Sequence, residues 1–242
     1  MVLLPFIETI TRLLNISNIP ASQVLVQHFT LWIAFLGAIL AARENSLLAL
    51  TRTPLFGKSS TSTIGEFIGK ITTFLVLVSL AFGSIELLKI EIIDSINVAP
   101  MIPRWFAQLI MPLGFSIMAI LILIKSCKQL SYKFLFFILF LVLSNSFFTE
   151  IIAENFPIRV LGTLIILIAL INGAPIFIGL GGFAVLFFWY DFTPIAAIPA
   201  EAYRIVVSPT LPTIPLFTFA GYLLAESNTS ERLVKVFREV FG

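Results

Sequence analysis

The sequence predicts an all-α integral membrane protein, with about seven to eight transmembrane helices and then a C-terminal amphipathic helix at the membrane interface. Of its 242 residues, 59% are hydrophobic and only 12% are charged, whereas a soluble domain has roughly 25% charged residues. The mean hydropathy is +1.06. Several long stretches contain no Asp, Glu, Lys or Arg: 13–42, 105–124, 134–149, 160–190 and 205–225.

The length and texture of these stretches favour helices over strands. A helix needs about 20 mostly apolar residues to cross a hydrocarbon core roughly 30 Å thick, and most of the stretches have that length. Strands of membrane barrels alternate apolar and polar residues, but residues 134–143 are apolar without alternation. Membrane lipid is therefore an expected partner.

Charge and cysteine content exclude other classes. The net charge is only +2, and no basic run interleaves with aromatic residues. We therefore expect no nucleic-acid partner. The single Cys127 can form no intrachain disulfide.

Four helices are expected first, over residues 24–42, 67–88, 105–124 and 134–149. Basic residues follow the first and third of them, and acidic residues follow the second and fourth. This alternation is typical of successive crossings under the positive-inside rule. The cations assigned to the inner side are Arg43, Arg52, Lys58, Lys125, Lys128, Lys133, Arg232, Lys235 and Arg238, against Arg12, Lys89, Arg104, Arg159 and Arg204 outside.

The uncharged stretch 160–190 is too long for one crossing. About 31 residues at 1.5 Å each span roughly 46 Å. Asn172-Gly-Ala-Pro175 lies near its midpoint, where Gly frees the backbone and Pro removes a donor. We therefore expect two short helices joined by a tight turn, and then a crossing over residues 205–225 that runs inward.

An amphipathic helix is expected at the end of the chain. Asn228 can cap it, with Glu231 three residues on. One face is apolar and the other charged, which suits a helix lying along the inner membrane surface. A frayed end is the alternative. The apolar face consists of Leu233, Val236, Phe237, Val240 and Phe241.

Polar residues within the apolar stretches are candidates for function, because they are costly in a bilayer. For His28, the only histidine, an interhelical hydrogen bond or an interfacial position is favoured over a proton relay. Glu66 and Lys70 are spaced to pair along one helix. Helix bridging or turn capping is expected of Asn145 and Asn172, and close helix packing of Gly179, Gly181 and Gly182.

Two segments in the first half resemble the small, Q-type membrane subunit of tripartite ATP-independent periplasmic (TRAP) transporters. In residues 25–44 the recurring Trp, Phe-x-Gly-Ala and Ala-x-Arg-Glu appear, and residues 102–118 are similar to that subunit's last helix, with a Pro-rich start and Pro-Leu-Gly. The resemblance marks Trp32, Gly37, Arg43, Glu44, Pro112 and Gly114 as family-signature structural residues.

The second half resembles the start of the large, M-type subunit. The matching motifs are Gly173-Ala-Pro175, Leu180-Gly-Gly-Phe-Ala184 and the segment 214–221, whose signature residues are Pro215, Phe217 and Gly221. The resemblance implies a Q-type region of four helices over 1–128, with its first helix truncated to residues 1–14. A connecting transmembrane helix would lie in 129–155, and the N-terminal part of an M-type region in 156–242.

The resemblance implies a function in transport. The complete transporter would be a multi-pass protein of the bacterial inner membrane that takes up organic acids such as carboxylates, driven by sodium. Its partners would be a periplasmic substrate-binding protein and the remainder of the large permease subunit. This chain would be a scaffold portion that does not transport alone, because the substrate-binding and sodium-binding residues are expected beyond residue 242.

No catalytic, cofactor-binding or metal-binding residue is expected in the chain itself. An intramembrane enzyme is disfavoured because the sequence has no His-Glu-x-x-His, no Gly-x-Ser-x-Gly and no paired intramembrane Asp. A non-transporting membrane scaffold or adaptor remains the alternative function.

Overall fold

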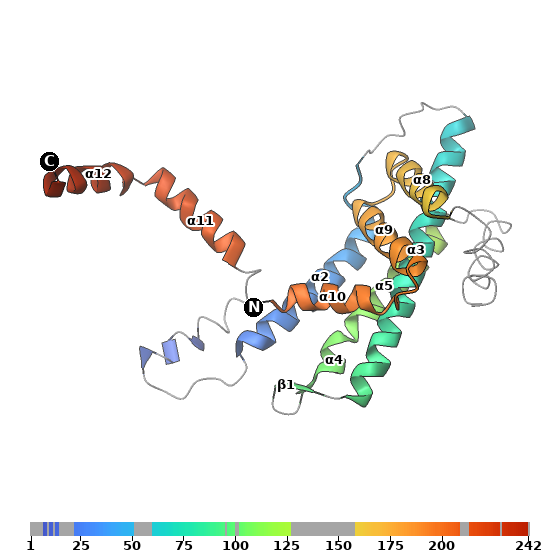
Figure 1. Cartoon of the computed structure of the whole chain (residues 1–242), viewed down its shortest axis with the longest axis horizontal. Helices are drawn as coiled ribbons and strands as arrows, with labels where there is room; N and C mark the ends of the chain where they lie inside the picture. The colour runs from blue at the N-terminus through green and yellow to red at the C-terminus, as the bar shows by residue number, and fades with distance from the viewer. Residues whose placement is uncertain are drawn as a thin grey trace. The chain divides into compact units, whose positions relative to one another are not determined.

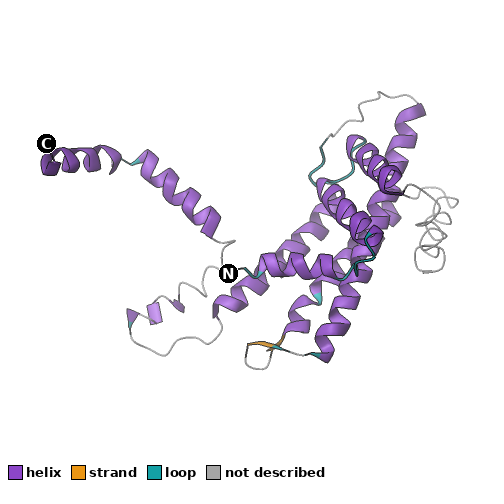
Figure 2. Cartoon of the chain, viewed as in Figure 1, coloured by secondary structure: helices purple, strands orange, loops and turns teal. Residues whose placement is uncertain are grey.

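The computed structural model describes residues 7–8, 10–11, 13–14, 22–50, 60–94, 96–99, 102–126, 158–208, 213–227 and 229–241. This part of the chain consists of helices, the loops that join them and one short β hairpin, as Figure 2 shows, so the all-α class is confirmed. The helices are α2 (Ser22–Glu44), α3 (Ser60–Ile93), α4 (Arg104–Gln108), α5 (Ile110–Ser126), α8 (Ile158–Ile171), α9 (Ile176–Tyr190), α10 (Ala197–Val206), α11 (Thr213–Glu226) and α12 (Thr229–Phe241), and the strands are β1 (Asn97–Ala99) and β2 (Ile102–Pro103) (Figure 1).

The chain divides into two compact units, Met1–Tyr203 and Arg204–Gly242. The first contains α2 to α9 and α10 as far as Tyr203. The second contains α11 and α12.

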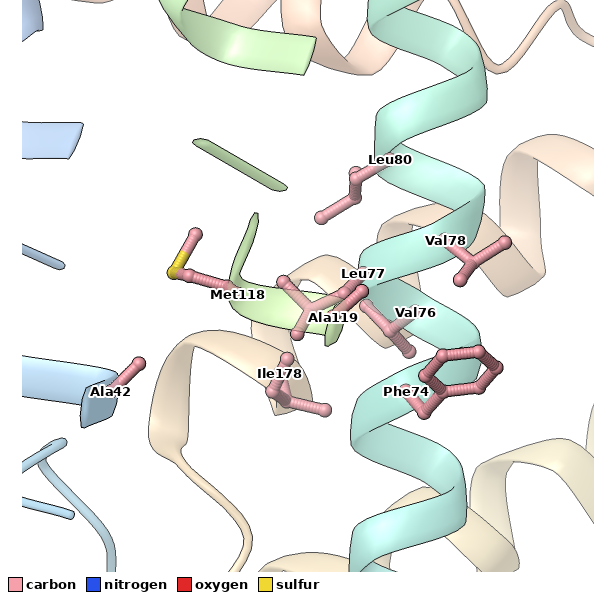
Figure 3. Close-up of a cluster of buried hydrophobic side chains, with 9 residues drawn as sticks. All are labelled: Ala42, Phe74, Val76, Leu77, Val78, Leu80, Met118, Ala119 and Ile178. Atoms are coloured by element: carbon pink, nitrogen blue, oxygen red, sulfur yellow. The ribbon is translucent and has the colours of Figure 1, made fainter. Parts of the chain in front are cut away.

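Helix α3 is the centre of the first unit and packs against α5, α8 and α9, while α2 packs against α5. Burial of apolar side chains is the main force that holds such a unit together. Figure 3 shows the core cluster around α3. It consists of Phe74, Val76, Leu77, Val78 and Leu80 from α3, Met118 and Ala119 from α5, Ala42 from α2 and Ile178 from α9.

Three helical segments of the described residues are long and apolar enough to cross a membrane: Val24–Glu44, Phe67–Ile93 and Arg104–Lys125. They coincide with three of the predicted helices. Helices α8 and α9 are apolar but shorter. The predicted helix 134–149 lies outside the described residues, as does most of the segment 1–14.

The third segment is two helices rather than the single helix predicted over residues 105–124. Helix α4 ends at Gln108, and α5 begins at Ile110. Pro112 explains the break, because proline has no N–H to donate to the carbonyl of Gln108 four residues earlier, and its ring clashes with that carbonyl.

The turn between α8 and α9 confirms the predicted break in residues 160–190. Gly173 has a φ of 92°, which glycine adopts without steric cost. The N–H of Ala174 donates to Ala169 O at 3.0 Å, and the N–H of Gly173 donates to Leu170 O at 3.2 Å. This pair of bonds is a Schellman motif, and Pro175 follows it as proline commonly does.

The α8–α9 turn lies beside the segment that follows α2. Ile176 N–H donates to Leu48 O at 2.9 Å, and Ala49 pairs with Pro175 in an isolated antiparallel bridge. The far end of the hairpin continues into a loop in which Ile195 approaches Gly83, in the second half of α3. These contacts define two ends of the bundle, which we name the Lys125 end and the Tyr203 end after the residues described below.

In the second unit, the predicted crossing over 205–225 is wrong at its start. Residues 205 and 206 belong to α10, and α11 begins at Thr213. Pro209 and Pro212 in the sequence between them explain the interruption. Helix α12 follows α11, and the predicted cap, Asn228, lies outside the described residues.

Candidate functional site at the two ends of the helix bundle

Polar contacts between helices gather at the two ends of the first unit, and they are the candidate functional features of this chain. Within the described residues, no group of three or more His, Cys, Asp or Glu side chains could hold a metal ion. The contacts described below join one helix to another.

His28 on α2 joins Tyr203 on α10 at the Tyr203 end. Its Nδ1 lies 2.7 Å from Val24 O, and its Nε2 lies 2.6 Å from Tyr203 Oη. A carbonyl oxygen only accepts, so Nδ1 carries the proton and Nε2 of the neutral ring accepts from the tyrosine hydroxyl. The structure thus confirms the interhelical hydrogen bond predicted for the only histidine.

Three further residues surround the Tyr203 hydroxyl. Gln108, only 1% exposed, donates from Nε2 to Glu91 Oε1 at 3.5 Å, a long hydrogen bond. Arg104 Nη1 lies 3.4 Å from the same oxygen. Burial raises the pKa of Tyr203 to about 12, against the opposing charge of Arg104 and with the support of Glu91. The phenol therefore stays protonated and able to donate at neutral pH.

Trp32 fastens α2 to α4 at the same end. Its Nε1–H donates to Ala107 O at 3.0 Å, and its ring lies 6.1 Å from that of Phe106. This predicted signature residue thus makes a specific cross-helix bond.

An ion pair closes the open end of the α8–α9 hairpin. Arg159 Nη2 lies 2.9 Å from Asp191 Oδ1, and the guanidinium lies over the ring of Tyr190, 4.0 Å from its centroid. Both partners are at least half exposed, so the pair itself contributes little stability.

Lys125, in the last turn of α5, caps the end of α2. Its Nζ donates to Ala42 O at 2.9 Å and to Asn45 Oδ1 at 3.0 Å, and it also donates to Arg43 O. The last carbonyls of a helix have no partner within it and carry partial negative charge. Lys125 of α5 therefore gives the carbonyl oxygens at the end of α2 a hydrogen-bond donor, and it joins the end of α2 to the end of α5.

The remaining signature residues of the first half differ in their surroundings. A Cβ at Gly114 would lie 2.3 Å from Phe35 Cδ1, so this glycine permits α2 and α5 to approach closely. At Gly37 nothing lies within 4 Å of such an atom. Pro112 is buried, whereas the side chains of Arg43 and Glu44 are exposed.

The signature residues of the second half fall in both units. Gly173 and Pro175 form the α8–α9 turn, and Pro215, Phe217 and Gly221 lie in α11. Phe217 is exposed, and no atom lies within 4 Å of a Cβ at Gly221. Gly173 and Pro175 thus lie together in one turn of the first unit, and Pro215, Phe217 and Gly221 share one helix of the second unit.

Other polar and small residues behave as predicted where they are described. Asn172 donates from Nδ2 to Ile168 O at 2.7 Å and lies against Gly65 of α3, so it both caps the turn and meets another helix. Gly179 and Gly182 lie against Leu170, Val76 and Ile166, as close packing requires. Asn145 and the side chain of Glu66 lie outside the described residues.

Sequence reasoning missed Tyr203, Gln108 and the cap by Lys125. Helix α10 itself was not predicted, because ten residues containing Pro199, Glu201 and Arg204 are too short and too polar to suggest a crossing. A signal for Tyr203 did exist. A buried histidine needs a partner, and a tyrosine in a short amphipathic segment was available.

Apolar helices held together by polar contacts at both ends, with three helical segments long enough to span a bilayer, define a helical membrane protein. A family model for the DctQ component of tripartite ATP-independent periplasmic transporters matches residues 1–131, more than half of the 242 residues. The chain belongs to this family, and is thus a TRAP transporter component. No curated protein and no solved structure matches the chain.

The family match explains the partners and the class of this protein. DctQ components work with a periplasmic binding protein and a large M subunit. The family consists of transporter components and is not an enzyme class.

Proposed function

We propose that this chain is a stationary scaffold portion of a TRAP transporter that couples sodium to the uptake of organic acids. The observation that carries the scaffold role is the fastening of the first unit at both ends. Lys125 bonds α5 to the end of α2, and His28 and Trp32 bond α2 to α10 and α4. Bonds at both ends of a packed bundle oppose sliding and tilting of its helices.

Close helix contacts support the same role. The glycines of α3 face the second half of the chain, where Gly69 lies against Ala169 and Ala174, and Gly83 lies against Ile195. Small residues let helix backbones approach without a hydrophobic driving force between helices in lipid. A tightly packed element suits the fixed partner of a moving transport domain.

For orientation, we propose that the Lys125 end faces the cytoplasm of a bacterium and the Tyr203 end faces the periplasm. The Lys125 end carries Arg43 and Lys125, as the positive-inside rule requires. At the opposite end, Arg104 and Arg159 are paired with Glu91 and Asp191. The periplasmic binding protein would then meet the chain at the Tyr203 end.

For the second unit, we propose that α12 lies on the cytoplasmic membrane surface. Its exposed Lys235 and Arg238 lie on the side of the helix away from Val240, and Arg232 lies at the border between the charged and the apolar face. A cationic face beside an apolar face suits a surface rich in anionic lipid.

Reconstitution into proteoliposomes tests the scaffold role. The chain is inserted alone, or together with the large subunit and a binding protein, and uptake of a labelled organic acid is measured with and without a sodium gradient. We expect uptake only from the complete set and only with sodium. Sodium-driven uptake by this chain alone would overturn the proposal.

The second candidate function is a membrane adaptor that takes no part in transport. It is favoured if the complete set transports at the same rate when this chain is omitted. The same vesicles provide that measurement.

A further inference from the structure

Residue Tyr203 lies outside the part of the chain that the DctQ family model matches, whereas the residues it meets lie inside that part. The match covers residues 1–131, which include His28, Glu91, Arg104 and Gln108. The side chains at the contact are buried, with His28 6%, Gln108 1% and Tyr203 9% exposed. The contact therefore joins the DctQ-matched bundle to a later segment of the chain.

The contact with His28 requires a hydrogen-bond donor, which the hydroxyl group of Tyr203 provides. The only proton of the neutral His28 ring is used by Val24 O, so Nε2 requires a donor. Tyr203 Oη supplies it at 2.6 Å. A phenylalanine would fill the same volume but leave a buried acceptor unsatisfied, which costs more than the bond itself contributes. We name His28, Gln108 and Tyr203 the tyrosine clasp.

The tyrosine clasp lies at a boundary along the chain. Tyr203 is the last residue of the first compact unit, and the second unit begins at Arg204. The clasp therefore includes the last residue of the first unit.

We propose that the tyrosine clasp is a docking interface that fastens α10, as far as Tyr203, to the DctQ-matched bundle. Its occupant is the segment Ala197–Tyr203 of this chain. The recognised group is a protonated phenol presented by a short helix. This inference does not depend on sodium coupling, on the substrate or on transport.

Limited trypsin digestion of the purified full chain tests the proposal. Cleavage after Arg204 requires α10 to open locally, and its rate follows the population of the open form. Tyr203→Phe keeps the ring but removes the donor, so we expect cleavage after Arg204 to become about tenfold faster. The matched control is Tyr190→Phe, which removes a hydroxyl that no described contact uses and should leave the rate unchanged.

Two further measurements distinguish the release of α10 from a general destabilisation of the bundle. His28→Phe should accelerate the same cleavage, and the double variant His28→Phe/Tyr203→Phe should be cleaved no faster than the faster single variant, because both changes remove one bond. Cleavage after Arg104 and Lys125 reports on the bundle and should not change with Tyr203→Phe.

Three results would overturn the proposal. The first is a wild-type rate of cleavage after Arg204 in Tyr203→Phe. The second is a double variant whose increase in that rate is the product of the increases in the two single variants. The third is cleavage after Arg104 and Lys125 that accelerates as much as cleavage after Arg204. None of these outcomes bears on uptake.

Discussion

At the scale of single residues, the buried hydroxyls of Thr73 and Ser84 have specific partners, whereas Oε1 of the buried Gln108 amide has no hydrogen-bond partner among the described residues. Thr73 and Ser84 donate to carbonyls one turn earlier on α3, each at 2.7 Å, so these polar groups can be buried without an unpaired donor. Tyr203 instead reaches a different helix. Its buried hydroxyl therefore joins α10 to α2.

The raised pKa of Tyr203 predicts a stability change at high pH. The pKa moves from 10.0 in the unfolded chain to about 12 when folded, so the neutral phenol stabilises the fold below pH 10, and this contribution is lost as the pH rises from 10 to 12. Two pKa units correspond to about 2.7 kcal/mol, and solvent screening around this partly buried group makes the loss smaller than that. Thermal unfolding in detergent should therefore show a steeper decline for the wild type than for Tyr203→Phe over this range. Parallel declines would contradict the prediction.

The signature glycines Gly114 and Gly37 predict opposite effects of one substitution. Gly114→Ala places a methyl group 2.3 Å from Phe35 Cδ1 and should destabilise the bundle by about 1–3 kcal/mol through overpacking. Gly37→Ala meets no atom within 4 Å and should stabilise it by up to about 1 kcal/mol. Unfolding temperatures in detergent provide the comparison. Equal shifts in the two variants would show that α2 and α5 do not approach as described.

At the scale of elements, three helices end in the same way. Asn45, Gly173 and Phe192 adopt a positive φ of 54°, 92° and 52° after α2, α8 and α9. In each case the next N–H donates back to a carbonyl five residues earlier, as in Ser46 to Ala41 and Thr193 to Phe188. This motif ends a helix sharply, and it permits the short connection between α8 and α9.

The cap on α2 predicts a local effect of changing Lys125. Lys125→Met keeps an apolar stem but leaves Ala42 O and Asn45 Oδ1 without their charged donor, so we expect a loss of about 1–2 kcal/mol. Hydrogen exchange at the Ser46 amide should become faster. The control is Lys89→Met on exposed α3 surface, which should leave that amide unchanged. A similar change in both variants would exclude a specific cap.

At the scale of the whole molecule, charged residues and contacts between segments distinguish the two ends of the first unit. The α8–α9 turn meets the segment after α2, so both belong to the Lys125 end. Strand β1 follows α3 and belongs with Arg104 and Glu91 to the other end. The proposed orientation therefore places the α8–α9 turn on the cytoplasmic side of the membrane and strand β1 on the periplasmic side.

Cysteine labelling in whole cells checks this orientation. In a Cys127→Ser background, Asn97→Cys on β1 should react with an impermeant maleimide from the periplasmic side, because this residue is exposed. Leu48→Cys, 77% exposed, should react only after the cells are opened. The reverse pattern would invert the proposed topology.

Much of this arrangement could be predicted from the sequence, because it follows from length and polarity. Uncharged runs located α2, α5, α8 and α9, the mostly apolar segment 67–88 located α3, and excess length with Gly173 and Pro175 located the turn. The Lys125 cap and the Tyr203 contact could not be predicted, since each depends on which helices become neighbours. The break at Leu109 could have been predicted from Pro112, whose effect on the preceding turn is local.

The length of α3 has a consequence for the surrounding lipid. Its apolar segment Phe67–Ile93 contains 27 residues, or about 40 Å of helix, against a hydrocarbon core of roughly 30 Å. Such a mismatch is relieved by helix tilt or by local thickening of the bilayer, at a cost that depends on acyl-chain length. Because α5, α8 and α9 pack on α3, any tilt of α3 involves them as well. The thickness of the host membrane then acts on the whole bundle at once.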